Sequence, residues 1–143
     1  MNGNVGDLKW FTIDADKWKS VDKTSEMLKV TIEGDNYHPD GQVDVFENVL
    51  LMNTPSNMDL PAADLSTAFN SDKTVTVTNN GNTGAIYVTL TTLAQGRFVN
   101  NGFLLPGGAS FDIEFVSILD EIEIDVDLLQ SSTRVECAND YVE

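Results

Sequence analysis

The residues from 73 to 127 constrain the fold of this chain more than any other stretch. Three runs in this stretch alternate apolar with polar side chains, TVTVT at 74–78, FDIEF at 111–115 and IEIDV at 122–126. Successive side chains of a strand point to opposite faces, so each run predicts a strand with one buried and one wet face. The segments NNGNTG and PGG between them supply residue types that turns require. The stretch therefore predicts an antiparallel β-sandwich or a small barrel.

Further strands are expected on both sides of these runs. The pattern favours strands at 8–13, 27–33, 42–52, 85–90 and 133–137, with a brief pairing near 96–99. The segment 54–72 is expected to be a connection, with room for one helical turn that begins at Pro61. The prediction is an all-β protein, an antiparallel β-sandwich of jelly-roll or immunoglobulin-like type, with seven to eight strands and no long helix.

The length of 143 residues favours one domain. A chain of this size can bury about 70% of the surface that its unfolded form exposes, enough for a core of its own. We expect a flexible N-terminal arm at 1–7, a single β-sandwich domain at 8–137 and a C-terminal tail at 138–143.

The chain is strongly acidic, with 23 Asp and Glu against 8 Lys and Arg and a net charge of −15. Nucleic-acid binding depends on cations that neutralise phosphates, so this balance disfavours it. It also disfavours adsorption to anionic membranes, and it favours solubility and cationic partners. We therefore expect neither a nucleic acid nor a membrane among the partners.

The charge is unevenly distributed. Residues 1–29 hold five Lys and five acids, so the remaining residues carry the whole net charge of −15. Both Trp residues lie in this neutral part, and Trp is enriched at the centre of protein interfaces. Trp10 could instead belong to the core of the first strand. We predict a partner interface in the N-terminal part, made by Trp10, Phe11, Lys17, Trp18 and Lys19.

Four carboxylates alternate with apolar residues at the end of the stretch 73–127. On a strand, the four acids would share one face at a spacing of about 7 Å and would repel one another. Three interpretations stay open: a solvated edge strand protected by charge, a docking face for a basic partner, or a divalent-cation site. A straight strand does not make its carboxylates converge, so we assign no metal. The residues of this acidic face are Glu121, Glu123, Asp125 and Asp127.

No catalytic motif is present in the sequence. Asp14 and Asp16 open like a calcium loop, but the later positions of that motif do not match. The single His38 lies in a turn-like segment, and the single Cys137 cannot form an intramolecular disulfide. We expect a protein that is not an enzyme and that carries no cofactor.

The N-terminal residues lack the basic and then apolar pattern of a signal peptide, and the aliphatic run at 49–52 is too short to span a bilayer. We expect the protein to be made in a cytoplasm and kept or assembled there.

Four motifs stand out in the second half of the chain: Asn82-Thr83-Gly84, Ile86-Tyr87-Val88, Leu104-Leu105-Pro106-Gly107 and Asp120-Glu121-Ile122-Glu123-Ile124. With these motifs, this half resembles small β-sandwich structural proteins of tailed bacteriophages. It implies a capsid decoration (cement) or head-fibre type of protein on the exterior of the virion, made in the host cytoplasm. It also implies the major capsid protein as partner and self-association, with a trimer as the first expectation.

Two alternatives stay open at this point. One is a tail or head–tail accessory protein. The other is a carbohydrate-binding or receptor-binding β-sandwich that would use Trp10, Trp18 or Tyr37 as stacking platforms.

Overall fold

The computed structural model describes residues 15–35, 43–70, 73–118 and 123–142. Within these ranges the chain forms nine strands and only short helices. The strands are β1 (Met27–Asp35), β2 (Val43–Leu51), β3 (Leu65–Phe69), β4 (Thr74–Asn79), β5 (Ala85–Thr91), β6 (Arg97–Phe98), β7 (Phe103–Leu105), β8 (Ser110–Val116) and β9 (Arg134–Glu136). The helices are α1 (Ala15–Ser20), α2 (Val126–Ser132) and the 3₁₀ turns η1 (Pro55–Asn57) and η2 (Ala138–Tyr141).

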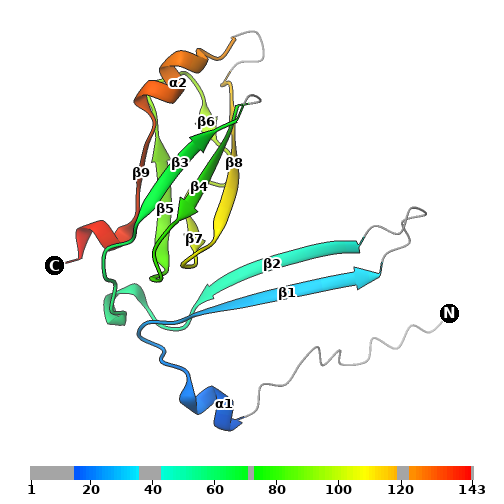
Figure 1. Ribbon diagram of the computed structural model, residues 1–143, viewed down its shortest axis with the longest axis vertical. Coiled ribbons are helices and arrows are strands. Elements are labelled where there is room, and N and C mark those ends of the chain that lie inside the picture. Colours follow the sequence, from blue (N-terminus) through cyan, green and yellow to red (C-terminus); the bar gives the residue numbers. More distant parts are fainter. Residues whose placement is uncertain (1–14, 36–42, 71–72, 119–122, 143) are drawn as a thin grey trace.

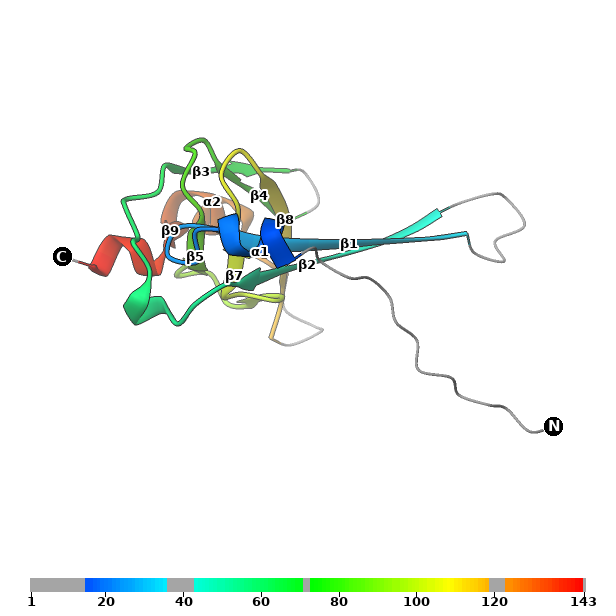
Figure 2. The same ribbon diagram turned by 90° about the horizontal axis from the view of Figure 1, so that it is seen from below.

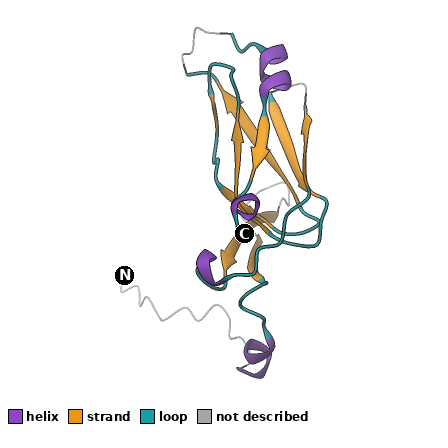
Figure 3. Ribbon diagram, turned by 90° about the vertical axis from the view of Figure 1, so that its left-hand side faces the viewer, coloured by secondary structure: helices purple, strands orange, loops and turns teal. Residues whose placement is uncertain are grey.

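Strands β3 to β9 form a sandwich of two sheets (Figures 1 and 3). One sheet has the order β3-β4-β8-β6 and the other the order β7-β5-β9, with all described pairs antiparallel. The chain crosses from the first sheet to the second directly after β4, so β4 pairs with the distant β8 rather than with β5. The predicted all-β antiparallel sandwich without a long helix is confirmed.

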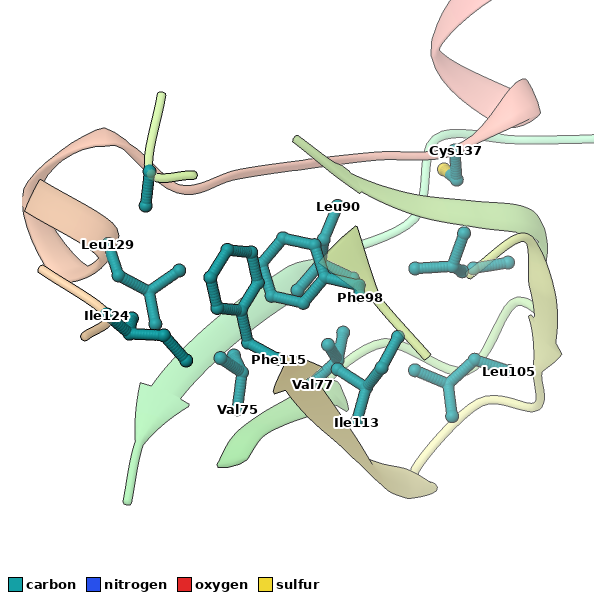
Figure 4. Packing of buried hydrophobic residues seen from close by; sticks show 13 residues of the cluster. Val75, Val77, Leu90, Phe98, Leu105, Ile113, Phe115, Ile124, Leu129 and Cys137 are labelled. Atoms are coloured by element: carbon teal, nitrogen blue, oxygen red, sulfur yellow. The ribbon is translucent and has the colours of Figure 1, made fainter. Parts of the chain in front are cut away.

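The alternation seen in the sequence builds the core between the two sheets (Figure 4). On β4, Val75 and Val77 have no exposed surface, while Thr74, Thr76 and Thr78, which alternate with them, are half-buried. On β8, Ile113 and Phe115 are 1% exposed. Phe115 packs edge-to-face against Phe98 with ring centroids 5.0 Å apart, an arrangement that aromatic pairs prefer. Val88, Leu90 and Leu105 of the second sheet complete this layer.

Three asparagine side chains replace backbone partners where the strand ladders stop. Asn139 accepts a hydrogen bond from the backbone N–H of Ile86 and donates to the carbonyls of Pro61 and Gly84. Asn101 accepts from the N–H of Leu90 and donates to the carbonyl of the same residue, both at 2.8 Å. These bonds satisfy backbone groups that would otherwise be buried without a partner.

The third side chain, Asn79, lies at the end of β4 with no exposed surface. It donates to the carbonyls of Thr83 and Leu105 and accepts from the N–H of Gly81. It therefore joins the turn after β4 to the end of β7. Gly107 lies against this turn, since a Cβ on it would lie 2.5 Å from the backbone of Asn82.

The strand predicted at 122–126 is wrong for the residues that the structure describes. Residues 123–125 belong to no strand, and α2 begins at Val126. Asp125 accepts a hydrogen bond from the N–H of Leu128 at 2.9 Å, which is the N-cap bond of this helix. Ile124 and Leu129 are buried in the core, so this segment closes the end of the sandwich opposite to the β1–β2 hairpin (Figure 1).

The segment 54–72 holds more structure than the sequence predicted. It contains η1 and the edge strand β3, while residues 61–64 form no helix. The expected helical turn at Pro61 is therefore wrong. The single domain expected at 8–137 stays a prediction; within it, the two sheets of the sandwich take only β3 to β9.

We predict that Ile113→Asp unfolds or strongly destabilises the sandwich. The side chain is 1% exposed, so the variant buries a carboxylate without a partner. A loss of about 4 kcal/mol or more in the free energy of unfolding is expected, measured by urea denaturation. The matched control is Ile118→Asp, because Ile118 is 69% exposed and should tolerate the same change. Equal losses in the two variants would contradict the described core.

Candidate docking surface on the N-terminal hairpin

Strands β1 and β2 form a separate two-stranded hairpin that projects from the sandwich (Figures 1 and 2). They pair antiparallel in an unbroken register from Met27 opposite Leu51 to Asp35 opposite Val43. The two predicted strands at 27–33 and 42–52 are thus confirmed as neighbours. Residues directly opposite each other share a face of the hairpin, so the register defines two faces.

One face of the hairpin is largely apolar, and its outermost pair is Gly34 with Asp44. Three of its cross-strand pairs are Leu28 with Leu50, Val30 with Asn48, and Ile32 with Phe46. Phe46 is 64% exposed, and Ile32 and Leu50 are each close to half exposed. No described residue covers these side chains to the depth of a core. We call this surface, made by Leu28, Val30, Ile32, Phe46, Asn48 and Leu50, the apolar hairpin face.

The opposite face anchors the hairpin at its root. Met27 and Leu51 pack against a small cluster at the lower end of the sandwich, formed by Met58, Leu60 and Ile86. Met27 lies so close to Gly84 that a Cβ there would be 2.5 Å from the methionine Cε. Glycine at this position therefore allows the hairpin root to approach the sandwich.

Further from the root, the opposite face is mixed, with Lys29, Thr31, Glu33 and Glu47 beside Val45 and Val49. Lys29 Nζ lies 2.7 Å from Glu47 Oε1, and Thr31 donates to the same oxygen at 3.4 Å. The hydrogen bond from Lys29 lowers the pKa of the exposed Glu47 carboxyl below its usual value. Both sides of this ion pair are about half exposed, so it contributes little to stability.

An open pocket of about 420 Å³ lies between this mixed face and the sandwich. Its other walls come from β7, the start of β8 and the turn between them. Lys29 and Glu47 are the titratable side chains among its described lining residues, and they are already paired with each other. Ser110 also lines the pocket, and its hydroxyl lies 2.9 Å from the hydroxyl of Thr78.

Helix α1 lies beside the hairpin root and carries three of the predicted interface residues. Trp18 is half-buried, with Lys23 Nζ 5.0 Å from its ring centroid. Lys17 and Lys19 are exposed. Trp18, Val21, Leu28 and Met52 line a shallow pocket of about 170 Å³ at the root of the apolar hairpin face.

A turn centred on Asp22 connects α1 to β1. Its carboxylate accepts hydrogen bonds from the hydroxyl and the N–H of Thr24 and from the hydroxyl of Ser25. These bonds hold the pKa of the exposed Asp22 carboxyl below its usual value, with the Thr24 hydroxyl as the largest cause. Asp22 is thus a local structural residue of the turn.

Three of the five predicted interface residues lie in the described part of the chain. The structure places Lys17, Trp18 and Lys19 together on α1, whereas Trp10 and Phe11 lie outside the described residues. The residues Asp14, Tyr37 and His38 lie outside them as well. Sequence reasoning missed the apolar hairpin face, although the alternation of Leu28, Val30 and Ile32 was visible.

The predicted acidic face is not a strand face in the described part of the chain. Glu121 lies outside the described residues, and Glu123 is exposed in a loop. Asp125 caps α2 with its side chain, and Asp127 lies in the first turn of that helix. Carboxylates in the first turn of a helix favour the helix over a strand. Across the ranges 15–35, 43–70, 73–118 and 123–142, no three His, Cys, Asp or Glu residues gather as metal ligands would.

Cys137 is 2% exposed at the end of β9. Burial raises the pKa of its thiol above the usual value, and the nearby Asp140 carboxylate adds to this. A buried thiol of this kind behaves as a small apolar residue. In the described part of the chain, no helix combines the length and the apolar composition needed to cross a membrane.

Two antiparallel sheets, packed face to face and connected by an early crossing of the chain, define an immunoglobulin-like β-sandwich. In agreement with this architecture, a family model of Ig-fold domains, Ig_mannosidase, matches residues 60–141. The match covers more than half of the 143 residues, and the chain belongs to this family of Ig-fold domains. Of the two sandwich types expected, the immunoglobulin-like one is therefore correct. No curated protein matches the chain. Helix α1 and the β1–β2 hairpin precede the matched region.

We predict that Asp125→Ala lowers the free energy of unfolding by about 1 kcal/mol, because the N-cap bond to Leu128 is lost. Urea denaturation measures the change. Glu123→Ala is the control, since Glu123 is exposed and lies before the helix. If both variants were as stable as the wild type, Asp125 would not cap a helix in solution.

Proposed function

We propose that this chain is a non-catalytic structural protein that docks onto a larger protein assembly through its β1–β2 hairpin. The observation that carries the proposal is the apolar hairpin face, whose Ile32, Phe46 and Leu50 stay exposed in the described part of the chain. A two-stranded hairpin is only marginally stable in water, and contiguous exposed apolar patches are typical of interaction sites. A partner that covers this face would stabilise the hairpin and gain apolar burial at the same time.

The non-catalytic part of the proposal is supported by the chemistry of the surfaces. The pocket beside the hairpin holds a paired Lys29 and Glu47, and the thiol of Cys137 is buried. An Ig-fold domain with such surfaces suits binding better than bond-making chemistry.

The finer proposal is a capsid decoration protein on the exterior of a tailed-bacteriophage head, with the major capsid protein as partner. Its support is the sequence resemblance carried by the turn at 82–84, strand β5 and the segment 104–107 at the end of β7. The fourth motif lends less support, because Glu123 and Ile124 lie in no strand. A protein that binds only the assembled shell shifts the equilibrium toward that shell.

The charge distribution favours the N-terminal part as the docking side. Residues 1–29 are neutral overall, whereas the rest of the chain carries the net charge of −15. A contact surface cannot hold many like charges against a partner without matching cations, but an outward surface can. The exposed Lys17 and Lys19 of α1 would contribute cations next to the hairpin root.

We predict that Phe46→Asp abolishes binding to undecorated phage heads, measured by co-sedimentation of the purified protein with the particles. The variant places a carboxylate in the apolar hairpin face, where burial would leave it without a partner. Because Phe46 is 64% exposed, the Ig-fold domain should stay folded, which circular dichroism checks.

The matched control is Val45→Asp, since Val45 is the neighbouring residue, is 54% exposed and lies on the opposite face of the hairpin. It should bind like the wild type. If Phe46→Asp also bound normally, the hairpin would not be the docking element. Binding to isolated tails in place of heads would identify the tail accessory alternative.

A further inference from the structure

We infer that the open pocket between the hairpin and the sandwich is a binding site for a neutral sugar ring. The pocket has about 420 Å³, which lies within the range of about 300–1,000 Å³ that is typical of small-molecule sites. The inference goes beyond the proposed docking role, because this site takes a small ligand and not a protein. It is carried by two unlike walls and by the balance of charge between them.

The wall on the sandwich is aromatic and aliphatic. Phe111, at the start of β8, is 38% exposed and lines the pocket. Its ring centroid lies 4.6 Å from that of Phe103, with a tilt of 37° between the rings. Phe103 packs against the core of the sandwich and thereby supports the Phe111 ring. Pro106 and Ala109 extend this wall. The face of an aromatic ring is electron-rich, so an exposed ring attracts the C–H groups on the apolar side of a sugar.

The wall on the hairpin holds a charged pair with spare hydrogen-bonding capacity. Lys29 Nζ lies 2.7 Å from Glu47 Oε1, and both side chains are about half exposed. Among the described residues, nothing donates to the second carboxylate oxygen of Glu47, and Lys29 donates to Glu47 alone. A sugar hydroxyl both donates and accepts, so it can bond to either group. Ser110 adds an exposed hydroxyl from β8.

The charges decide between the classes of small ligand. Lys29 and Glu47 cancel each other in the described lining of the pocket, whereas the whole chain carries −15. The field of such a chain repels an anion, and a cation would compete with Lys29 for Glu47. A wholly apolar ligand would bury the ion pair without giving it new hydrogen bonds, which is costly. A neutral ring with an apolar side and several hydroxyl groups avoids all of these costs, and a pyranose is such a ring.

The surrounding strands do not favour an extended peptide. β7 is the edge strand of its sheet, so a peptide strand could add to it only there. It has only three residues, Phe103–Leu105, and therefore offers few backbone groups. The hairpin runs across the direction of the sandwich strands (Figure 1), so β2 does not prolong this edge. The pocket thus suits a compact ring better than a strand.

The sugar site and the docking surface lie mainly on different faces of the hairpin. Lys29, Glu47 and Val49 belong to the face opposite to the apolar hairpin face. Asn48 is the one residue of the apolar hairpin face in the described lining of the pocket. A partner that covers Phe46 therefore leaves the ion pair open to a ligand. Phe46→Asp, which should lose binding to phage heads, should keep the sugar affinity of the wild type, so the two roles can fail separately.

The experiment is a titration of the full, isotope-labelled chain, followed by two-dimensional NMR. The probes are methyl glucopyranoside, methyl galactopyranoside and methyl N-acetylglucosaminide. At least one of them should shift the amide signals of the pocket residues in a saturable way, with a dissociation constant on the order of millimolar. The anionic methyl glucuronide should bind at least about tenfold more weakly, because the acidic chain repels it.

Two variants of Phe111 test the aromatic wall. Phe111→Ala should weaken the binding of the same glycoside at least about tenfold, since the ring surface is lost. Phe111→Tyr keeps the ring and should bind within about threefold of the wild type. Circular dichroism checks that both variants are folded.

The polar wall is tested with an exposed residue, so the result does not depend on the stability of the Phe111 variants. Glu47→Gln should weaken binding by about three- to tenfold, because a charged acceptor forms stronger hydrogen bonds than an amide. The matched control is Glu33→Gln. Glu33 is an exposed acid on the same face of the hairpin and lies outside the described lining of the pocket, so this variant should bind like the wild type.

Several results would overturn the inference. They are the absence of a saturable shift with all three glycosides, shifts confined to residues away from the pocket, and equal losses in Glu47→Gln and Glu33→Gln. Tighter binding of the glucuronide would identify an anion site in place of a neutral sugar site. A capped tetrapeptide of alternating Val and Thr that shifts the pocket signals, where the glycosides do not, would identify an extended peptide as the ligand.

Discussion

The Ig-like domain depends on side-chain amides that satisfy backbone groups where its strands stop pairing. Asn139 is 3% exposed and joins β5 to the segments before β3 and after β9 through three hydrogen bonds. Asn101 and Asn79 do the same at the other end of β5 and at the turn after β4. An unpaired buried amide or carbonyl costs about as much as a lost hydrogen bond. These three residues therefore let short strands close a sandwich whose ladders alone leave backbone groups unpaired.

The hairpin obeys a different constraint. Its backbone groups pair only between β1 and β2, and its apolar burial is confined to the root, where Met27 and Leu51 reach the sandwich. Nothing of this kind supports the outer half, whose Ile32 and Phe46 are exposed. The sandwich thus pairs its backbone groups and buries its apolar residues by itself, whereas the hairpin leaves apolar side chains exposed. β4 and β1 alternate apolar and polar residues in the same way, yet β4 lies in the core and β1 keeps apolar side chains exposed. Their different burial is therefore set by the topology and not by the local sequence.

This difference explains which features the sequence could predict. The strands at 74–78 and 111–115 were predictable, because their alternating residues match the two faces of a sandwich strand. The segment 122–126 alternates equally well, yet Asp125 caps a helix and Ile124 turns into the core. The helix start was visible as Asp125 followed by Asp127 in the first turn, a signal that competed with the alternation. The apolar hairpin face could not be predicted, because alternation shows that a face is apolar and says nothing of what covers it.

Exposure alone does not distinguish this face from the rest of the surface. Leu93, Ile118 and Tyr141 are more exposed than any large apolar residue of the hairpin. They lie singly on loops and on η2, however, and scattered apolar residues are normal on a protein surface. What sets the hairpin apart is continuity: six side chains, five of them apolar, lie in three adjacent pairs on an element that is marginal by itself, and Asp44 comes in the next pair outward. A contiguous and mostly apolar patch on a chain of net charge −15 is the place where association costs least in like-charge repulsion. The acidic composition and the apolar hairpin face therefore act together, since the charge discourages contacts elsewhere and the face supplies the contact that remains favourable.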